Sequence, residues 1–240
     1  FMYTFQTRVR YSELDVEEKL GIAAIVDYFQ DCSTFQSEAL GVGLSYLKER
    51  GLVWVMSCWQ IMIDRYPGLG DQITVGTFPY AFKGFLGYRN FFLEDAEGKK
   101  IVRANSIWTL MDLEAGRPAR ATDAMLEAYR MEPKLDMEYE PRKVRLSGEG
   151  EEQSGFYVGK QHLDGNRHVN NAEYIRMAQA YLPEGFEIGR MRAEYRKSAL
   201  LHDRIVPVVY GQENRMGVSL EDGEGAPFAV VEFTARHLEI

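Results

Sequence analysis

Three polar residues that could act together on a carbonyl group stand two positions apart in the stretch Leu163-Asp-Gly-Asn-Arg-His-Val-Asn-Asn171. They are Asp164, Asn166 and His168. Side chains alternate along an extended segment, so we expect all three to project from the same side. A carboxylate can attack or activate water, an amide can orient a reactant, and an imidazole can transfer a proton. The cluster is therefore a candidate site for attack on a carbonyl carbon.

A helix is predicted directly after this cluster. Apolar residues recur at helical spacing between Ile175 and Leu182, Asn170 or Asn171 is a suitable N-cap, and Pro183 would end the helix. The start of a helix offers backbone N–H groups and the positive end of the helix dipole.

Those N–H groups would suit a developing oxyanion. We expect the backbone of Val169, Asn170 and Asn171 to supply the donors.

Two other interpretations of the cluster remain. An Asp-x-Asn segment before a helix often only forms a turn and a cap, because short polar side chains bond to nearby backbone. Alternatively, His162, Asp164 and His168 could hold a metal ion with one open position. That second interpretation leaves Asn166 and the helix cap without a role, so no metal is expected.

Composition narrows the class of protein. The 240 residues, 45% of them hydrophobic, are enough for one large or two small globular domains. No apolar run reaches the length of a membrane span, and the N-terminus lacks a basic and then apolar leader. The net charge of −8 argues against a general nucleic-acid binder. Cys32 and Cys58 suit no disulfide scaffold, so we expect buried thiols in a reducing cytoplasm.

The first half of the chain predicts a helix followed by a sheet. A strand at 3–11 and a polar loop at 12–21 precede an amphipathic helix at 23–40, whose apolar stripe runs from Ile25 to Ala39. Strands rich in β-branched and aromatic residues follow at 53–63, 72–78, 87–93 and 101–111. Antiparallel strands around one long helix indicate an α+β arrangement.

The same plan occurs again in the second half. A surface helix at 122–131 and a charged, glycine-rich segment at 147–155, either a linker or a long surface loop, lead to a strand at 156–162 and the second helix. Four strands follow at 190–199, 204–210, 216–220 and 228–237. Leu14-Asp15 matches Leu163-Asp164 at an offset of 149 residues (164 − 15). Two copies of one unit are therefore expected, residues 1–146 and 147–240.

Several blocks of sequence are similar to one known family. They are Val53-Trp-Val-Met56, Asp64-Arg-Tyr-Pro67, Arg103-Ala-Asn-Ser-Ile-Trp108 and, above all, the Asp-x-Asn-x-His-Val-Asn-Asn segment that begins at Asp164. Over nearly its whole length the chain resembles the acyl-acyl-carrier-protein thioesterases of bacteria and plastids. The resemblance implies an α+β fold of two tandem hotdog units, each an antiparallel sheet wrapped around a long central helix.

The resemblance also implies an activity. Members of the family hydrolyse fatty acyl-acyl-carrier-protein thioesters to free fatty acid and holo-carrier protein, and their catalytic roles fall on Asp164, Asn166 and His168. The partner is then an acyl carrier protein with a phosphopantetheine-linked acyl chain, and no cofactor is needed. An acyl-CoA thioesterase, a hotdog hydratase that uses Glu173, and a non-catalytic acyl-binding protein remain as alternatives. The protein could also form a homodimer, which the sequence does not decide.

The chain departs from the plant members in the segment Glu194-Tyr-Arg-Lys-Ser-Ala199. Plant members carry Glu and Cys where this chain has Ser198 and Ala199, which excludes a cysteine nucleophile there. On an extended strand Glu194 and Ser198 would share a face. We therefore expect Ser198 to position water within reach of Asp164.

Substrate contacts are expected in both repeats. Apolar side chains of the first repeat could line a slot for the acyl tail, with Trp54, Met56 and Phe85 as the main candidates. Arg192 and Arg196 belong to the densest basic group near the proposed site, and could meet an acidic carrier protein. A structurally paired strand face is the competing interpretation for these arginines.

The first repeat is not expected to be catalytic. Its loop has Asp15, Glu17 and Lys19 where the second repeat has the polar cluster. An ammonium group is a poor substitute for an imidazole in proton transfer near neutral pH.

Overall fold

The structure, a computed structural model, describes residues 1–236. Its described chain divides into two compact units. Unit 1 comprises residues 1–57 and 63–139, and unit 2 comprises residues 58–62 and 140 onward. The two units adjoin in sequence at Tyr139 and Glu140, and a short piece of the first repeat joins unit 2, while the expected domain boundary between residues 146 and 147 stays a prediction.

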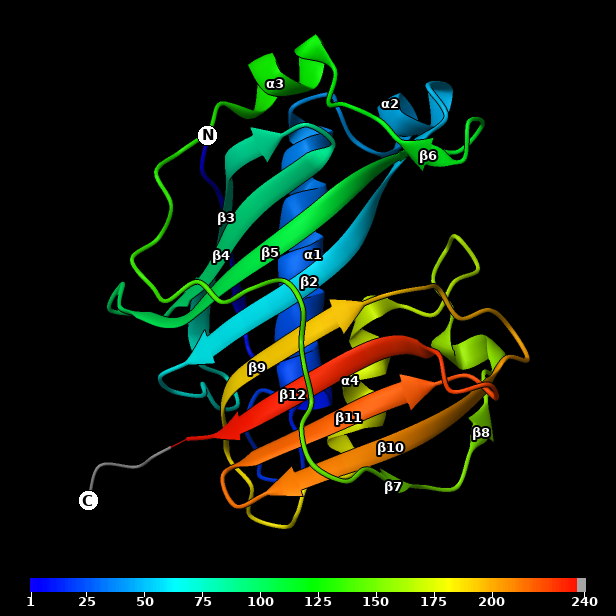
Figure 1. Cartoon of the computed structure of the whole chain (residues 1–240). Coiled ribbons are helices and arrows are strands. Elements are labelled where there is room, and N and C mark those ends of the chain that lie inside the picture. The colour runs from blue at the N-terminus through cyan, green and yellow to red at the C-terminus, as the bar shows by residue number, and fades with distance from the viewer. Residues whose placement is uncertain (237–240) are drawn as a thin grey trace. The chain divides into compact units, whose positions relative to one another are not determined.

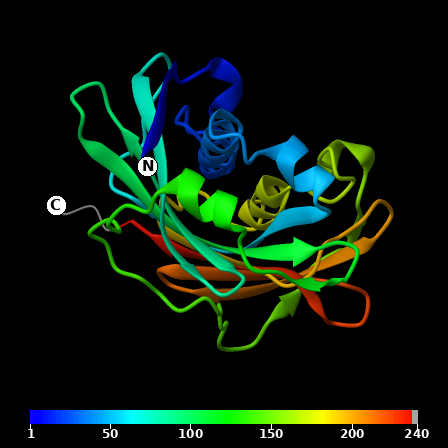
Figure 2. The ribbon, with the colours of Figure 1, turned by 90° about the horizontal axis from the view of Figure 1, so that it is seen from above.

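Unit 1 is an antiparallel sheet packed against a long helix. Its strands are β1 (Tyr3–Arg8), β3 (Gln72–Lys83), β4 (Leu86–Glu94), β5 (Lys100–Asp112) and the first part of β2 (Leu52–Ile63), in the order β1-β3-β4-β5-β2. A two-residue strand, β6 (Arg117–Pro118), pairs with the end of β5. Helix α1 (Ile22–Ala39) packs against β1 and β3 and lies along one face of this sheet (Figures 1 and 2).

The apolar stripe of α1 explains its orientation, with one exception. Ile25, Phe29 and Cys32 are fully buried, as the helical spacing predicts. Phe35 was expected on this face but is 47% exposed, and the polar Gln36 is buried in its place. Gln36 accepts a hydrogen bond from the buried Arg89 of β4, so a polar contact sets which side of the last turn of α1 faces the sheet.

Two short helices cover one end of unit 1. They are α2 (Leu44–Glu49) and α3 (Asp123–Tyr129). The predicted surface helix is thus confirmed, and the Thr122 hydroxyl caps it by accepting the Met125 N–H at 3.2 Å. Apolar side chains from these helices, from β5 and from the segment before α2 form a small buried cluster of Val42, Leu47, Leu110, Met125 and Tyr129.

Unit 2 repeats this plan with a shorter helix. Its sheet has residues 58–62 of β2 next to β9 (Ile188–Tyr195), then β12 (Pro227–Ala235), β11 (Arg215–Glu221), β10 (Arg204–Gln212) and β7 (Glu151–Glu152). Helix α4 (Asn171–Gln179) packs against β11 and β12, and its 9 residues compare with 18 in α1. It ends before Leu182, which the spacing had included.

The predicted strand at 156–162 is much shorter than expected. Only β8 (Phe156–Tyr157) is extended, and it pairs with the start of β10. Residues Lys160–His162 form a 3₁₀ turn, η2, and Tyr11–Glu13 form the matching turn η1 in unit 1. The last predicted strand is β12, and its final predicted residue, His237, lies outside the described residues.

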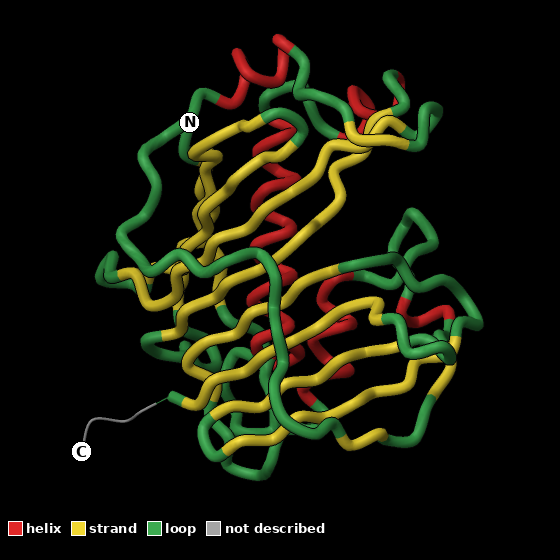
Figure 3. The backbone as a smooth tube through the Cα atoms, viewed as in Figure 1, coloured by secondary structure: helices red, strands yellow, loops and turns green. Residues whose placement is uncertain are grey.

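A strap formed by residues 140–150 crosses the outer face of the unit 2 sheet, which is the face opposite α4 (Figure 3). The carbonyls of Pro141 and Lys143 accept hydrogen bonds from Arg192 on β9. An added Cβ at Gly217 on β11 would lie 2.4 Å from Leu146, so the strap also lies closely on that strand. The linker expected at 147–155 is a mostly exposed segment, and within it residues 151–152 form β7 against β10.

The two units share one arrangement, an antiparallel sheet packed on one helix, and the predicted α+β tandem-hotdog architecture is confirmed. Within residues 1–236, none of the helices has the length and apolar character needed to cross a membrane.

Candidate active site

The candidate catalytic segment forms a closed loop in the structure. One oxygen of the Asp164 carboxylate, Oδ1, accepts the backbone N–H of Asn166 at 2.8 Å and of His168 at 3.2 Å. The Asp164 N–H donates to the His168 carbonyl at 2.8 Å, and Leu163 forms a β-bridge with Val169. Arg167 takes a left-handed conformation, with φ at 62°, to complete the turn.

The loop corrects the expected alternation of the three side chains. An extended strand cannot describe a segment whose ends are joined by backbone hydrogen bonds. Asp164 is half-buried, whereas Asn166 and His168 are exposed. The turn interpretation of Asp164 is thus correct for one of its two oxygens, and the second is available for chemistry.

The helix start beside the loop is confirmed, with Asn170 as its cap. The Asn170 side chain accepts the Ala172 N–H at 2.9 Å, and α4 begins at Asn171. Two of the three expected oxyanion donors are engaged elsewhere, however. The Val169 N–H donates to the Ala199 carbonyl at 3.1 Å, and the Asn170 N–H donates to the His162 carbonyl at 2.9 Å. The expectation for Val169 and Asn170 is therefore wrong in this structure.

A tyrosine that the sequence patterns did not single out links α4 to the segment after β9. The buried Tyr174 hydroxyl accepts the Ala199 N–H at 2.8 Å. Burial raises the pKa of Tyr174 to about 12, and the Asp203 and Asp164 carboxylates reinforce that rise. The Tyr174 ring meets Tyr195 edge-on, and the Tyr195 hydroxyl donates to the Asn171 carbonyl at 3.0 Å.

These contacts place residues 199–200 beside the Asp164 loop. His168 forms a β-bridge with Leu200, next to the residue that Tyr174 holds. A tyrosine one turn after the Asn-Asn pair was the available signal. Its role could not be predicted from local patterns, because its partner Ala199 is 25 residues away in the sequence.

Ser198 does not occupy the expected strand face. β9 ends at Tyr195, and Ser198 is an exposed residue of the following segment. The Glu194 carboxylate instead accepts the Val144 N–H of the strap at 3.2 Å and pairs with Arg196 at 3.1 Å. The argument that Glu194 and Ser198 share a strand face is therefore wrong.

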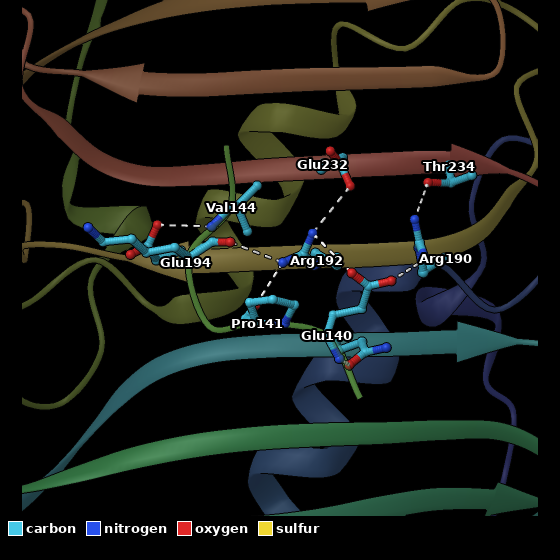
Figure 4. Close-up of polar contacts among 10 residues, drawn as sticks. Glu140, Pro141, Val144, Arg190, Arg192, Glu194, Glu232 and Thr234 are labelled. Atoms are coloured by element: carbon cyan, nitrogen blue, oxygen red, sulfur yellow. Dashed lines mark hydrogen bonds and ion pairs between the residues drawn. The ribbon is translucent and has the colours of Figure 1, made fainter. Parts of the chain in front are cut away.

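The expected carrier-binding arginine Arg192 is a structural residue (Figure 4). Its guanidinium lies 3.5 Å from the Glu140 carboxylate of the strap and 3.8 Å from the buried Glu232 carboxylate of β12. Glu140 also pairs with Arg190 at 2.7 Å, and the Arg192 side chain is only 12% exposed. Arg196 differs, because its side chain is 41% exposed.

One ring nitrogen of His162, a ligand in the metal interpretation, is engaged by the backbone. The Nδ1 atom of His162 accepts the Gly159 N–H at 3.0 Å, so this nitrogen already has a partner. No group of three metal-binding side chains occurs within residues 1–236.

Unit 1 contains the same loop with different side chains. Asp15 Oδ1 accepts the N–H groups of Glu17 at 2.9 Å and Lys19 at 3.2 Å, and Glu18 has φ at 59°. Each of these residues lies 149 positions before its partner in unit 2 (164 − 15, 167 − 18). The internal repeat is thus confirmed at the level of single hydrogen bonds.

The residues expected to line an acyl slot are all in unit 1. Trp54 is half-buried against the α2–α3 cluster, with its ring 6.2 Å from Phe82. Met56 is buried, and Phe85 is 44% exposed in the turn between β3 and β4. Their contact with an acyl chain stays a prediction.

Comparison with known proteins supplies the family. The sequence model of the acyl-ACP thioesterase N-terminal domain matches residues 1–129. The chain is 26% identical over 207 residues to the acyl-[acyl-carrier-protein] hydrolase FATB2 of Cuphea viscosissima, a match covering 79% of this chain and 50% of the relative. It is 27% identical over 203 residues to the oleoyl-acyl carrier protein thioesterase 2 of Arabidopsis thaliana, covering 77% and 55%. The chain spans about half the length of the curated relatives it matches.

Solved structures share the whole fold. An acyl-ACP thioesterase from Bacteroides thetaiotaomicron superposes with a TM-score of 0.91 at 21% identity, covering 98% of both chains. The 12:0-ACP thioesterase from Umbellularia californica gives a TM-score of 0.85 at 20% identity, covering 98% of this chain and 97% of the other. At these identities the likeness concerns the fold, and the sequence match over residues 1–129 supplies the family. The chain belongs to the acyl-ACP thioesterase family.

Proposed function

We propose that this protein hydrolyses the thioester between a fatty acyl chain and the phosphopantetheine arm of an acyl carrier protein. The products are a free fatty acid and the holo-carrier protein with its free thiol. The observation that carries the proposal is the Asp164 loop, which holds a carboxylate, an amide and an imidazole in one turn at the start of α4. Family membership supports the choice of a thioester as the substrate.

In the proposed mechanism, Asp164 is the reactive carboxylate. Both hydrogen bonds that its side chain accepts within the described chain go to Oδ1, so the loop fixes the group while Oδ2 reacts. Oδ2 either attacks the acyl carbon to form an anhydride, which water then hydrolyses, or removes a proton from the attacking water. In both routes the carbon–sulfur bond breaks, and the electron pair leaves with the pantetheine sulfur.

The other two residues serve the same step. His168 protonates the leaving thiolate, and the exposed position of its imidazole leaves it accessible to a pantetheine arm. Asn166 orients the attacking water or the acyl carbonyl through its amide. We assign no role to Ser198, because β9 ends at Tyr195 and does not carry Ser198 on the face of Glu194.

Unit 1 receives the acyl tail in this proposal. Its loop has the aspartate but neither the amide nor the imidazole, while its aromatic residues Trp54 and Phe85 suit an alkyl chain. We assign Met56 to the same wall.

The partner is an acidic acyl carrier protein, and the setting is fatty acid biosynthesis in a reducing cytoplasm. Cys32 and Cys58 are buried thiols outside any disulfide, which supports a reducing compartment. Arg196 remains a candidate contact for the carrier. Arg192 is not proposed as one, because it is already paired with Glu140 of the strap and with Glu232.

Acyl-CoA is the competing substrate. In the proposed mechanism the Asp164 loop acts on the thioester group, which acyl-CoA and acyl-carrier protein share. Arg192, which was expected to contact the carrier, is instead paired within the protein. Thiol release should be measured with the same acyl chain attached to carrier protein and to CoA. A higher kcat/KM on the carrier-bound chain supports the proposal. A higher value on acyl-CoA would reassign the substrate, and no release from either would leave a non-catalytic acyl-binding protein.

A further inference from the structure

One buried cation in unit 1 has no anionic partner. The residue is Arg89 on β4, which is 7% exposed and points toward α1. Its Nη1 donates to the Gln36 side-chain oxygen at 2.5 Å and to the Thr77 hydroxyl at 3.0 Å. Both acceptors are neutral, and within the described chain its guanidinium forms no ion pair.

This arrangement is unusual within the same protein. Arg192 is nearly as buried, but two carboxylates lie against it, and Arg190 also has one (Figure 4). A buried charge is strongly destabilising unless it is paired and hydrogen-bonded. Burial also lowers the pKa of Arg89 from its ordinary value, which reflects the same cost. A selected role would explain why the chain keeps a cation in this place.

The position of Arg89 suggests that role. Its guanidinium carbon lies 5.2 Å from the centre of the Tyr129 ring. The Tyr129 ring lies 5.9 Å from Phe82, and Phe82 lies 6.2 Å from Trp54. A continuous series of aromatic rings therefore leads from Trp54, the main candidate for the acyl wall, to the guanidinium. At the same end, the Tyr129 hydroxyl hydrogen-bonds to Ser37 at 2.7 Å, so polar groups other than Arg89 also lie there.

We infer that Arg89 forms the polar end of an acyl-binding site in unit 1, and that this site takes chains bearing an oxygen function, a hydroxyl or a carboxylate, on their distal part. The apolar length of such a chain would lie along Trp54 and Phe82, and its oxygen would accept a hydrogen bond from the guanidinium. The inference rests on the proposed function, because it takes unit 1 to be the part that receives the acyl tail.

Binding of inert ligands tests the inference separately from hydrolysis. The probes are S-alkyl-pantetheines, which have a thioether in place of the thioester, in a series of chain lengths. Each length is made with a methyl, a hydroxyl or a carboxylate end, and the Kd is measured by calorimetry on the whole protein. At the best length we expect the oxygen-bearing chain to bind about tenfold more tightly than the methyl-ended chain, as hydrogen bonds to a charged group imply.

Variants then locate the preference. Arg89→Met should remove the tenfold difference, and Arg89→Lys should retain part of it. Arg103→Met is the matched control, because Arg103 also lies on a unit 1 strand but pairs with the exposed Asp64. It should leave the preference unchanged.

Several outcomes would overturn the inference. Wild-type protein that binds methyl-ended chains as tightly as oxygen-bearing ones at every length would reduce Arg89 to a brace between α1 and β3. A preference that survives in a folded Arg89→Met variant would place the polar end elsewhere, and no binding of any probe would leave unit 1 without an acyl site. Failure of the proposed function would be seen separately, as an absence of thiol release from thioester substrates.

Discussion

At the scale of single residues, Asp164 has two roles that a substitution can separate. Its Oδ1 holds the loop through two backbone N–H groups, and we assign the chemistry to Oδ2. Asp164→Asn keeps an oxygen that can accept those bonds but removes the nucleophile and base. We expect turnover to fall by about a hundredfold or more while the melting temperature changes little.

The matched control is Asp15→Asn, which makes the same change in the same loop of unit 1. Thiol release and thermal unfolding should be measured on both variants. If Asp15→Asn lost as much turnover as Asp164→Asn, the chemistry could not be assigned to unit 2.

A second prediction at this scale concerns the imidazole. His168→Ala should reduce kcat by about a hundredfold, because the leaving thiolate would lose its proton donor. Lys19→Ala changes the equivalent position of unit 1 and should leave kcat close to wild type. Single-turnover thiol release isolates the chemical step. A near wild-type rate in His168→Ala would remove this residue from the mechanism.

At the scale of elements, the hydroxyl of Tyr174 holds the segment after β9 to α4. Tyr174→Phe would leave the buried Ala199 N–H without its acceptor, at a cost of about 1–3 kcal/mol. We also expect a displaced His168 loop, because Leu200 pairs with it. The measurements are denaturant unfolding and kcat, with Tyr195→Phe as the control that spares Ala199.

The same tyrosine predicts a dependence of stability on pH. Its folded pKa of about 12 lies above that of an unfolded tyrosine, so the folded state holds the phenolic proton more tightly. The resulting stability, of order 2–3 kcal/mol, is present below about pH 10 and is lost as pH rises through about 12. Subtracting the alkaline unfolding curve of Tyr174→Phe from that of the wild type should isolate this loss. Parallel curves would contradict it.

The strap yields a prediction for the arginines of β9 and the segment after it. Arg192→Ala would strip the buried Glu232 of a cation and two strap carbonyls of their donor, so we expect a loss of about 3 kcal/mol or more. Arg196→Ala breaks a more exposed ion pair and should cost less than about 1 kcal/mol. Urea unfolding compares the two directly. Equal costs would mean that the strap adds little to unit 2.

At the scale of the whole molecule, most of the architecture could be predicted from residue patterns. Apolar alternation and helical spacing depend on local geometry, so the start of α1 and the long strands were predicted close to their observed positions, whereas the strand predicted at 156–162 was mostly wrong. The repeat was also predictable, because Leu14-Asp15 and Leu163-Asp164 keep the same spacing to their helices.

What sequence patterns missed depends on contacts between distant residues. Nothing local in residues 140–150 indicates that Glu140 will meet Arg190, or that the strap will cover Arg192. The Asp164 loop was taken for a strand because polar residues at every second position satisfy both geometries. Tyr174 was missed because its partner, Ala199, is distant in the sequence.

The proposed division of labour between the units predicts a change in substrate range. Trp54→Ala would enlarge the apolar wall of unit 1, so acyl chains two carbons longer than the wild-type optimum should gain roughly tenfold in relative kcat/KM. A ladder of acyl-carrier substrates measures this shift. Ser57→Ala serves as the control, because Ser57 lies on the same strand but its hydroxyl hydrogen-bonds to Thr109. Loss of activity at all lengths without a shift would indicate a purely structural tryptophan.

The matching loops of the two units have a practical consequence for protein engineering. Because the backbone around Asp15 already has the hydrogen bonds of the loop around Asp164, a second reactive centre could be grafted there by changing side chains alone. Glu17→Asn and Lys19→His would complete the set without insertion or remodelling. The graft, placed in a chain whose original centre has been silenced, would measure how much of the rate comes from the three side chains and how much from their surroundings.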